Sequence, residues 1–338
     1  MNAWKRFASL FLGLAMIAGL TACGGQDAPA DTDAPETEAP AEDTVESESS
    51  AFPFTLKTHM DMEVTFDHVP ETVIACNPNA GDQLMALGLG DKIIATAYNN
   101  SRVAEPYREE YESKPIVAED YISLETILDL DPDFCYGRSS SFSEKRNTTH
   151  DTLSGYGIAS LSSIEGYTVG ADIDVVYQDF YNLGRIFQVE DKAEEIVEGM
   201  KAKVAAVEEA VADEEIVKVL VYDMATEDGV YTCGDNFTSK LIAHAGGKNI
   251  FADMEKTWAS VSLEEIVERA PDVIVINDYG SIPLETKMSE LKDNPALADV
   301  PAIANDNIMS IPLAECFACS MTADTVEKFA HAFHPNCF

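Results

Sequence analysis

Two stretches of the chain share one pattern: Ser-Leu-Glu, a short apolar helix, Pro-Asp and then an apolar run. They read SLETILDLDPDFCYG, from Ser123, and SLEEIVERAPDVIVI, from Ser262. In each, the serine can cap a helix, which we expect at Leu124–Leu130 and at Leu263–Arg269. The second apolar run is β-branched without polar alternation, which is typical of a strand buried on both faces of a parallel sheet. The repeat therefore predicts paired helix–strand units of an α/β fold.

A second pair of segments supports the duplication. LMALGLGDKI, from Leu84, resembles LIAHAGGKNI, from Leu241, and each reads as a helix closed by glycine and followed by a strand. Both pairs occur in the same order along the chain. We therefore predict two related lobes, and we expect the extra length of the first one in the polar, Tyr-rich stretch 98–115.

Residues 171–215, between the lobes, have helical periodicity. Asp172 and Asp174 can cap a helix that ends near Phe187, and Asp191 can start a second helix with apolar residues at helical spacing. No Gly-Pro break interrupts the second helix. We therefore predict two Rossmann-like α/β lobes joined stiffly by a long α-helix, with a ligand cleft between them. The boundaries that we expect are 51–170 for the N-terminal lobe, 171–215 for the interlobe segment and 216–338 for the C-terminal lobe.

The first residues read as a lipoprotein signal. Lys5 and Arg6 precede an apolar run, residues 7–20, that is too short to span a bilayer comfortably. The letters LTAC that end at Cys23 resemble a bacterial lipobox. This predicts a signal peptide over 1–22, cleavage before Cys23 and lipidation of its thiol, which gives a stable membrane anchor. An ordinary signal peptide with a chance cysteine is the alternative.

The stretch 23–50 reads as an acidic, disordered tether. It holds nine acidic residues and no Lys or Arg, and almost nothing in it can be buried to offset the entropy of ordering it. The whole chain has a formal net charge of −38, which argues against a nucleic-acid partner, since phosphate binding needs a basic face. We expect an extracytoplasmic body that is anchored to the cell membrane through lipid.

Several motifs, taken in order, resemble one protein family. They are the lipobox, the acidic tether, the LMALGLGDKI segment, the repeat at Ser123 and a Trp-x-x-Val-Ser-x-Glu segment that starts at Trp258. Together they are similar to the substrate-binding proteins of ABC importers for ferric siderophores, haem and cobalamin, over residues 66–338. The resemblance implies two Rossmann-like lobes, a rigid interlobe helix and a small metal-chelate ligand held in the cleft. We expect a monomer that needs no cofactor.

The same resemblance gives the repeat a role. In the family, the glutamate of each Ser/Asn-x-Glu helix lies on the face that docks on the permease, where it meets arginines. Those positions are Glu125 and Glu264, so the resemblance implies docking of one lobe on each subunit of a permease dimer. From the residues alone, a glutamate in the first turn of a helix is also explained by the favourable helix dipole.

Ligand contacts are expected in the loops that follow the carboxyl ends of the strands, because such loops line the crevice of open α/β sheets. Several of these loops are rich in aromatic and amide side chains, and that composition suits a large, partly apolar ligand. Trp258 sits where the cobalamin-binding member of the family presents a cleft tryptophan, and Arg138 can hold a carboxylate or catecholate of the ligand. The candidate ligand-binding residues are Asn77, Asn79, Tyr98, Tyr136, Arg138, Trp258, Tyr279 and Phe317.

The function predicted from the sequence is capture of an iron chelate, either a ferric siderophore or haem, and its delivery to the permease. A cobalamin or corrinoid receptor of the same family is the alternative. From another class, a surface metal-handling enzyme or chelatase on the same fold stays open, because fold alone does not exclude catalysis. We expect no enzyme, since the chain lacks a Gly-x-Ser-x-Gly motif and a phosphate-binding glycine loop.

The C-terminal cysteines and histidines have spacings that can bind zinc or haem iron, or form a disulfide. They are Cys316, Cys319, His331, His334 and Cys337. The segment also resembles the last helix of the family, with an apolar stripe along one face. We therefore predict no metal site here, and leave a disulfide between Cys316 and Cys319 open.

Overall fold

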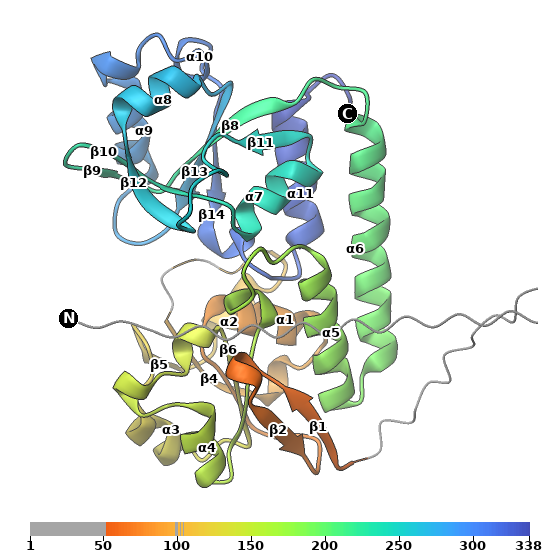
Figure 1. The fold of residues 1–338 in the computed structure, drawn as a ribbon. Coiled ribbons are helices and arrows are strands. Elements are labelled where there is room, and N and C mark those ends of the chain that lie inside the picture. Colours follow the sequence, from red (N-terminus) through yellow and green to blue (C-terminus); the bar gives the residue numbers. More distant parts are fainter. Residues whose placement is uncertain (1–51, 99–100, 102, 104) are drawn as a thin grey trace, which may run out of the picture. The chain divides into compact units, whose positions relative to one another are not determined.

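The fold is described from a computed structural model, which covers residues 52–98, 101, 103 and 105–338 (Figure 1). All of them belong to one compact unit, Ser49–Phe338. The predicted signal peptide, Cys23 and the tether lie outside the described residues, so these predictions stay predictions. Within the part of the chain that the structure describes, no helix has the length and apolar character needed to cross a membrane.

The N-terminal lobe is built on a five-stranded parallel sheet with the order β5-β4-β3-β6-β7. An antiparallel hairpin, β1–β2, precedes it. The strands are β1 Phe54–Lys57, β2 Glu63–Phe66, β3 Val73–Ala75, β4 Ile93–Ala97, β5 Ile116–Ala118, β6 Phe134–Gly137 and β7 Ala159–Ser162. The helices are α1 Pro78–Ala86, α2 Arg108–Glu112, α3 Leu124–Leu130 and α4 His150–Gly155, with short 3₁₀ turns η1 His59–Asp61, η2 Gly90–Lys92, η3 Ser139–Ser141, η4 Glu144–Arg146 and η5 Ile164–Gly166.

The C-terminal lobe has a four-stranded parallel sheet, β11-β8-β13-β14, and a three-stranded antiparallel sheet, β12-β10-β9. The strands are β8 Val217–Tyr222, β9 Met224–Thr226, β10 Gly229–Cys233, β11 Gly247–Asn249, β12 Trp258–Ser262, β13 Val273–Asp278 and β14 Ile308–Pro312. The helices are α7 Phe237–His244, α8 Leu263–Arg269, α9 Leu284–Lys292, α10 Pro301–Ala304 and α11 Thr322–Phe333, with 3₁₀ turns η6 Pro295–Leu297 and η7 Leu313–Cys316.

The duplicated unit has the same local structure in both lobes. Helices α3 and α8 start and end where the sequence predicts, and the hydroxyls of Ser123 and Ser262 each accept a hydrogen bond from the backbone N–H of the third helical residue, at 3.2 Å. Both helices end in a left-handed residue, Asp131 or Ala270. A buried strand follows in each case, β6 or β13. The predicted α/β class and the pairing of the two units are confirmed.

Two helices connect the lobes: α5, Asp174–Phe187, and α6, Glu190–Val211. Helix α6 packs against α5 and α11 and runs alongside both lobes (Figure 1). The predicted cap of α5 is wrong, because the residue at the cap is Ile173 and no side chain caps the helix. The carboxylate of Asp172 instead accepts a hydrogen bond from His244 at 2.8 Å, which explains why an aspartate lies there.

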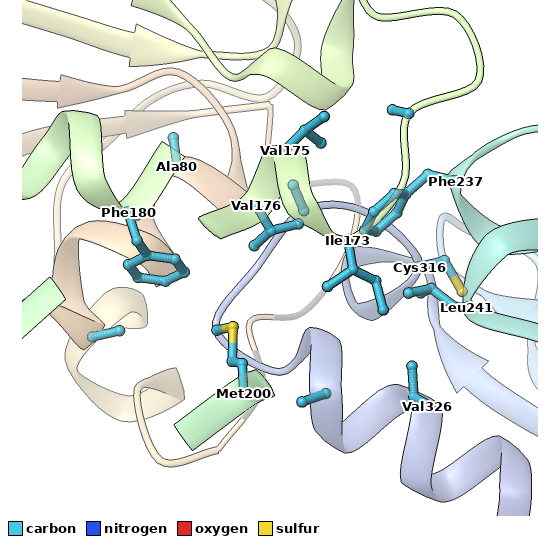
Figure 2. Close-up of a cluster of buried hydrophobic side chains, with 14 of the residues drawn as sticks. Ala80, Ile173, Val175, Val176, Phe180, Met200, Phe237, Leu241, Cys316 and Val326 are labelled. Atoms are coloured by element: carbon cyan, nitrogen blue, oxygen red, sulfur yellow. The ribbon is translucent and has the colours of Figure 1, made fainter. Parts of the chain in front are cut away.

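One apolar core passes from lobe to lobe (Figure 2). Val176 of α5 and Met200 of α6 lie in the same buried cluster as Leu241 of α7 and Val326 of α11. Full burial of such a side chain contributes about 1.5–3 kcal/mol. Separating the lobes would expose this cluster, so the core accounts for the stiff connection that the uninterrupted second helix predicts.

His244 adds a polar link at the same place. Its ring nitrogens bond to Glu208 of α6 at 2.6 Å and to Asp172, which precedes α5. Burial alone lowers the pKa of His244, but the hydrogen bonds and charges of the two carboxylates outweigh burial and raise the pKa above its usual value. The charged imidazolium donates from both nitrogens, so it fits a position between two carboxylates.

We predict that His244→Gln destabilises the protein mainly at acidic pH. Because the pKa is raised on folding, the stabilisation is fully present below the ordinary histidine value of about 6.5 and is lost as pH rises through the folded pKa. We expect the free energy of unfolding to fall by about 1 kcal/mol at low pH, after allowing for solvent screening. Urea unfolding at several pH values measures this, with exposed His331→Gln as the control. A loss that grows with pH would contradict the prediction.

Candidate functional site

Each of the two parallel sheets has one switch point, where successive strands of the chain are added on opposite sides of a central strand. In the N-terminal lobe, β4 and β5 lie on one side of β3, and β6 and β7 lie on the other. In the C-terminal lobe, β11 lies on one side of β8, and β13 and β14 lie on the other. Ligands of open α/β sheets bind outside the carboxyl ends of strands at such switch points. The residues there are Asn77 after β3, Arg138 after β6, Asp223 after β8 and Tyr279 after β13.

All four of these residues line one cavity of about 560 Å³, which we call the cleft cavity. Both lobes contribute to its wall, and two further hollows adjoin it, each sharing lining residues with it. The lining residues of the cleft cavity are Asn77, Pro78, Asn79, Tyr98, Ser101, Tyr121, Arg138, Ser140, Asp223, Tyr231, Trp258, Tyr279, Leu313, Ala314 and Phe317. Six of them are aromatic, which gives the wall large flat surfaces.

The structure brings together seven of the eight predicted ligand-binding residues. Those in the wall are Asn77, Asn79, Tyr98, Arg138, Trp258, Tyr279 and Phe317. Tyr136 does not line the cavity, contrary to the expectation from the sequence: its side chain is fully buried, and its hydroxyl donates to Gln83 at 2.5 Å. The reason is that Tyr136 lies inside strand β6, whereas Arg138 lies just beyond its end.

Two aromatic residues of the wall were not predicted. Tyr121 stacks on Tyr98, with ring centroids 4.4 Å apart, and Tyr231 stacks on Trp258 at 5.9 Å. Tyr231 lies on β10, in the antiparallel sheet, so it follows no strand of the parallel sheet. The rule that finds loops after parallel strands therefore does not find it. The pairing of β10 with β12 that brings Tyr231 beside Trp258 is a property of the tertiary structure, so no local signal in the sequence identifies it.

Arg138 already has partners on both sides. Its guanidinium forms an ion pair with Glu165, at 3.2 Å, and lies 3.8 Å from the ring centroid of Phe317 in the other lobe. The Glu165 side chain is only 8 % exposed, and burial raises the pKa of its carboxyl while the Arg138 charge lowers it. An anionic ligand group would therefore have to compete with a buried carboxylate for this guanidinium. The structure does not favour the predicted catecholate contact.

Asp223 lies in the opposite wall. It is 4 % exposed and accepts hydrogen bonds from Asn277 Nδ2, at 2.9 Å, and from Tyr279 Oη, at 2.7 Å. Burial and this bond to Asp223 raise the pKa of the Tyr279 hydroxyl, so it stays a donor. The buried ammonium of Lys287 donates to the Asn277 carbonyl at 2.6 Å. Both neutral donors hold the Asp223 carboxylate in one orientation.

The charged residues of the cleft are mostly acidic. Among the described residues that line the cleft cavity and the two adjoining hollows, Arg138 is the one guanidinium, beside six carboxylates. The carboxylates belong to Glu112, Glu165, Asp223, Asp235, Asp278 and Glu285. Glu112, Asp235 and Glu285 are exposed, and Asp235 is paired with Lys240 at 2.8 Å, so water and salt screen these charges. The excess of carboxylates still disfavours an anionic ligand.

Hydrogen bonds between the lobes close one side of the cleft cavity. Asn79 donates to the Ala314 carbonyl at 2.7 Å, and Gln83 donates to the Ala318 carbonyl at 3.1 Å. Tyr136 donates to the same Gln83 side chain, so its role is to orient an interlobe contact. The buried carboxylate of Asp82 accepts from both the backbone and the hydroxyl of Ser320.

The C-terminal cysteines form no disulfide in the structure. Cys316 and Cys319 are buried free thiols, and burial raises the pKa of both. His334 instead lies against the Gly246 carbonyl, at 3.2 Å. Among the described residues, no group of three or more His, Cys, Asp or Glu side chains is arranged to hold a metal ion.

The two repeat glutamates occupy equivalent, exposed positions. Glu125 and Glu264 lie in the first turns of α3 and α8, and neither forms an ion pair or a hydrogen bond through its side chain with the described residues. Helices α3 and α8 belong to different lobes and lie on the side away from α6 (Figure 1). Both carboxylates are therefore available to a partner.

Comparison with known proteins places this architecture among transport proteins. The family model described as periplasmic binding protein matches residues 73–314. The chain is 24% identical to the uncharacterized ABC transporter substrate-binding lipoprotein YvrC of Bacillus subtilis, over 98% of this chain and 97% of that one. It is 27% identical to the cobalamin-binding protein of Halobacterium salinarum, over 97% and 85%. The structure of an ABC-type Fe³⁺-hydroxamate transport system from Saccharomonospora viridis superposes with a TM-score of 0.70 at 25% identity, over 84% and 99%.

We predict that Asp82→Asn stabilises the protein at neutral pH. Burial raises the pKa of Asp82 to about 6, although the Ser320 hydrogen bonds oppose this. Ionisation of Asp82 therefore lowers the free energy of unfolding above pH 6, by at most about 3 kcal/mol. It has no effect at low pH, where the carboxyl is protonated in both the folded and the unfolded protein. Urea unfolding should show that the gain of the variant disappears towards pH 4. Exposed Asp213→Asn is the control, and a variant less stable than the wild type at neutral pH would refute the prediction.

Proposed function

This chain belongs to the periplasmic binding protein family, and on that premise we propose that it captures a metal chelate without net negative charge, first of all a corrinoid. It then delivers the chelate to an ABC importer. Relatives of the chain are transport binding proteins, not enzymes. A ferric hydroxamate is the second candidate.

The observation that carries this proposal is the composition of the cleft. Six aromatic side chains line the cleft cavity, and the described lining of the cavity and its two adjoining hollows holds a single guanidinium and six carboxylates. Ferric catecholates carry several negative charges, and haem presents two propionates, so both would bury anions against this wall. A corrinoid has an apolar ring and neutral amide arms, and its metal adds no negative charge. Aromatic faces suit the ring, and the polar atoms of the wall suit the amides.

The relatives support the same order of candidates. The Halobacterium salinarum protein is named for cobalamin binding, and its match extends over 97% of this chain. The Saccharomonospora viridis structure is named for Fe³⁺-hydroxamate transport. The sequence alone placed iron chelates first; the acidic cleft is the reason to place the corrinoid before them.

The positions of the two repeat glutamates support delivery to a permease. We propose that Glu125 and Glu264 meet cationic residues of the permease, one lobe on each subunit of a permease dimer. A symmetric partner calls for two matched contacts, and the duplication supplies them. The shared core limits the lobes to a small motion. We further propose that the protein acts as a monomer outside the cytoplasm, held to the membrane by lipid on Cys23, and that a separate ATPase drives transport.

We predict that a corrinoid quenches the fluorescence of Trp258. Trp4 is the other tryptophan of the chain, so Trp4→Phe in the full-length protein leaves one reporter, which lies in the cleft wall. We expect saturable quenching by a corrinoid and binding of a ferric catecholate or haem that is weaker by at least about tenfold. Calorimetry checks the affinities independently of quenching. Tightest binding of the catecholate or haem would refute the charge argument.

We predict that Glu125→Ala/Glu264→Ala abolishes most uptake without changing ligand affinity. The two carboxylates lie on α3 and α8, outside the residues that line the cleft cavity, so their loss removes only the docking contacts. Uptake of labelled corrinoid by cells measures transport, and calorimetry measures binding. The matched control is Glu109→Ala/Glu190→Ala, which removes two exposed first-turn glutamates from α2 and α6. Equal uptake by the two double variants would sink the docking proposal.

A further inference from the structure

We propose that the C-terminal wall of the cleft cavity is a subsite for an organic cation, formed by the Asp223 carboxylate with Tyr231, Trp258 and Tyr279. The chemical class that fits is an alkylammonium group carried by the ligand, such as a quaternary ammonium. This inference rests on the proposed function's assignment of the cleft as the ligand site, and it goes beyond that function because the neutral amide arms of a corrinoid carry no such cation. It adds that the C-terminal lobe recognises a positive charge on the ligand.

The first support is the state of Asp223. A carboxylate that is 4 % exposed has lost most of its water, and such a charge is costly unless it is paired. Its hydrogen-bond donors, Asn277 and Tyr279, are neutral. Among the described residues, no Lys, Arg or His nitrogen lies within 4.0 Å of its oxygens. Because Asp223 also lines the cavity, a ligand cation can supply the missing counter-charge.

The second support is the aromatic surface beside Asp223. The Tyr231 and Trp258 rings are nearly parallel, with an interplanar angle of 17°, and both line the cavity. The bond from its hydroxyl to Asp223 ties the Tyr279 ring to the same site. Aromatic faces attract cations, and Trp and Tyr do so most strongly. Three aromatic side chains around a carboxylate therefore combine both interactions that hold an alkylammonium.

Lys287 is the competing explanation, because its charge could balance Asp223 from behind. The Lys287 ammonium feels the charge of Asp223 but forms no ion pair with it. It donates instead to the backbone carbonyl of Asn277 and lies 4.5 Å from the centroid of the Tyr279 ring. Lys287 is 1 % exposed and does not line the cavity. Lys287 therefore contacts Asn277 and Tyr279 on the side away from the cavity, and a ligand in the cavity can still reach Asp223.

The opposite wall does not offer the same chemistry. Its cation, Arg138, is paired with Glu165 and covers Phe317. The two walls thus differ: the N-terminal one presents amides, the stacked Tyr98 and Tyr121 rings and a guanidinium that is paired with Glu165. The C-terminal one presents aromatic rings with a carboxylate that has no ion pair among the described residues. A ligand with one cationic end would bind in a single orientation.

The test compares two small probes of nearly the same shape. Choline is a quaternary ammonium alcohol, and 3,3-dimethylbutan-1-ol is its neutral isostere. Each is titrated into the full-length Trp4→Phe protein, with Trp258 fluorescence as the readout. We expect saturable binding of choline that is tighter than that of the isostere by about tenfold or more. Equal affinities, or no binding of choline at millimolar concentration, would overturn the proposal.

Variants show whether Asp223 is responsible. Asp223→Asn keeps the shape of the side chain and should bring the ratio of the two affinities close to one. Asp278→Asn, which removes another cleft carboxylate, should leave the ratio unchanged. Tyr231→Leu keeps Asp223 and should weaken choline more than the isostere. Circular dichroism confirms folding, and if Asp223→Asn fails to fold, Tyr231→Leu decides: an unchanged ratio would refute the subsite.

A corrinoid titration of the same protein separates the two proposals. If the corrinoid binds and choline shows no preference over its isostere, the subsite is wrong and the proposed function stands. If choline binds through Asp223 and no metal chelate binds, the subsite stands and the proposed ligand class is wrong.

Discussion

The apolar core shared by the two lobes is the constraint on which the rest of the structure depends. Helix α6 packs against α5, α7 and α11, and their apolar side chains form one cluster, so the lobes cannot separate without exposing it. This core sets the distance between the switch point of one parallel sheet and that of the other. Hydrogen bonds such as Asn79 to Ala314 and Gln83 to Ala318 then close one side of the cavity.

Because the distance between the lobes is fixed, the buried charged groups of the cleft keep their positions and partners. Arg138 reaches from one lobe to the Phe317 ring of the other and stays paired with Glu165, which leaves the N-terminal wall nearly neutral. Asp223 is oriented by neutral donors and has no ion pair among the described residues. In a rigid cleft these groups cannot move far to suit a ligand, so the ligand has to match them. Selection by charge is therefore a direct result of the stiffness of the fold.

Much of the fold could be predicted because its signals are local. The two serine caps, the glycine that ends α1 and α7, and the β-branched run of β13 each act within a few residues. Most of the cleft residues could be predicted for a related reason: they follow parallel strands. Tyr136 was assigned wrongly because one position separates a strand interior from the loop beyond it, and Tyr231 was missed because it reaches the cleft from an antiparallel sheet.

The sequence by itself determined the class of fold, the duplication and the exposed pair Glu125 and Glu264, because helix caps, strand periodicity and repeats are written in neighbouring residues. Only the tertiary structure decided which partners the buried charges have. Arg138 and Glu165 are separated by 27 residues in the sequence, and Asp223 and Tyr279 by 56, yet each pair is in contact. Each pair lies within one lobe and depends on how the strands are ordered in its sheet, whereas the contact of Arg138 with Phe317 depends on how the lobes are held together. Both are properties of packing over long sequence separation.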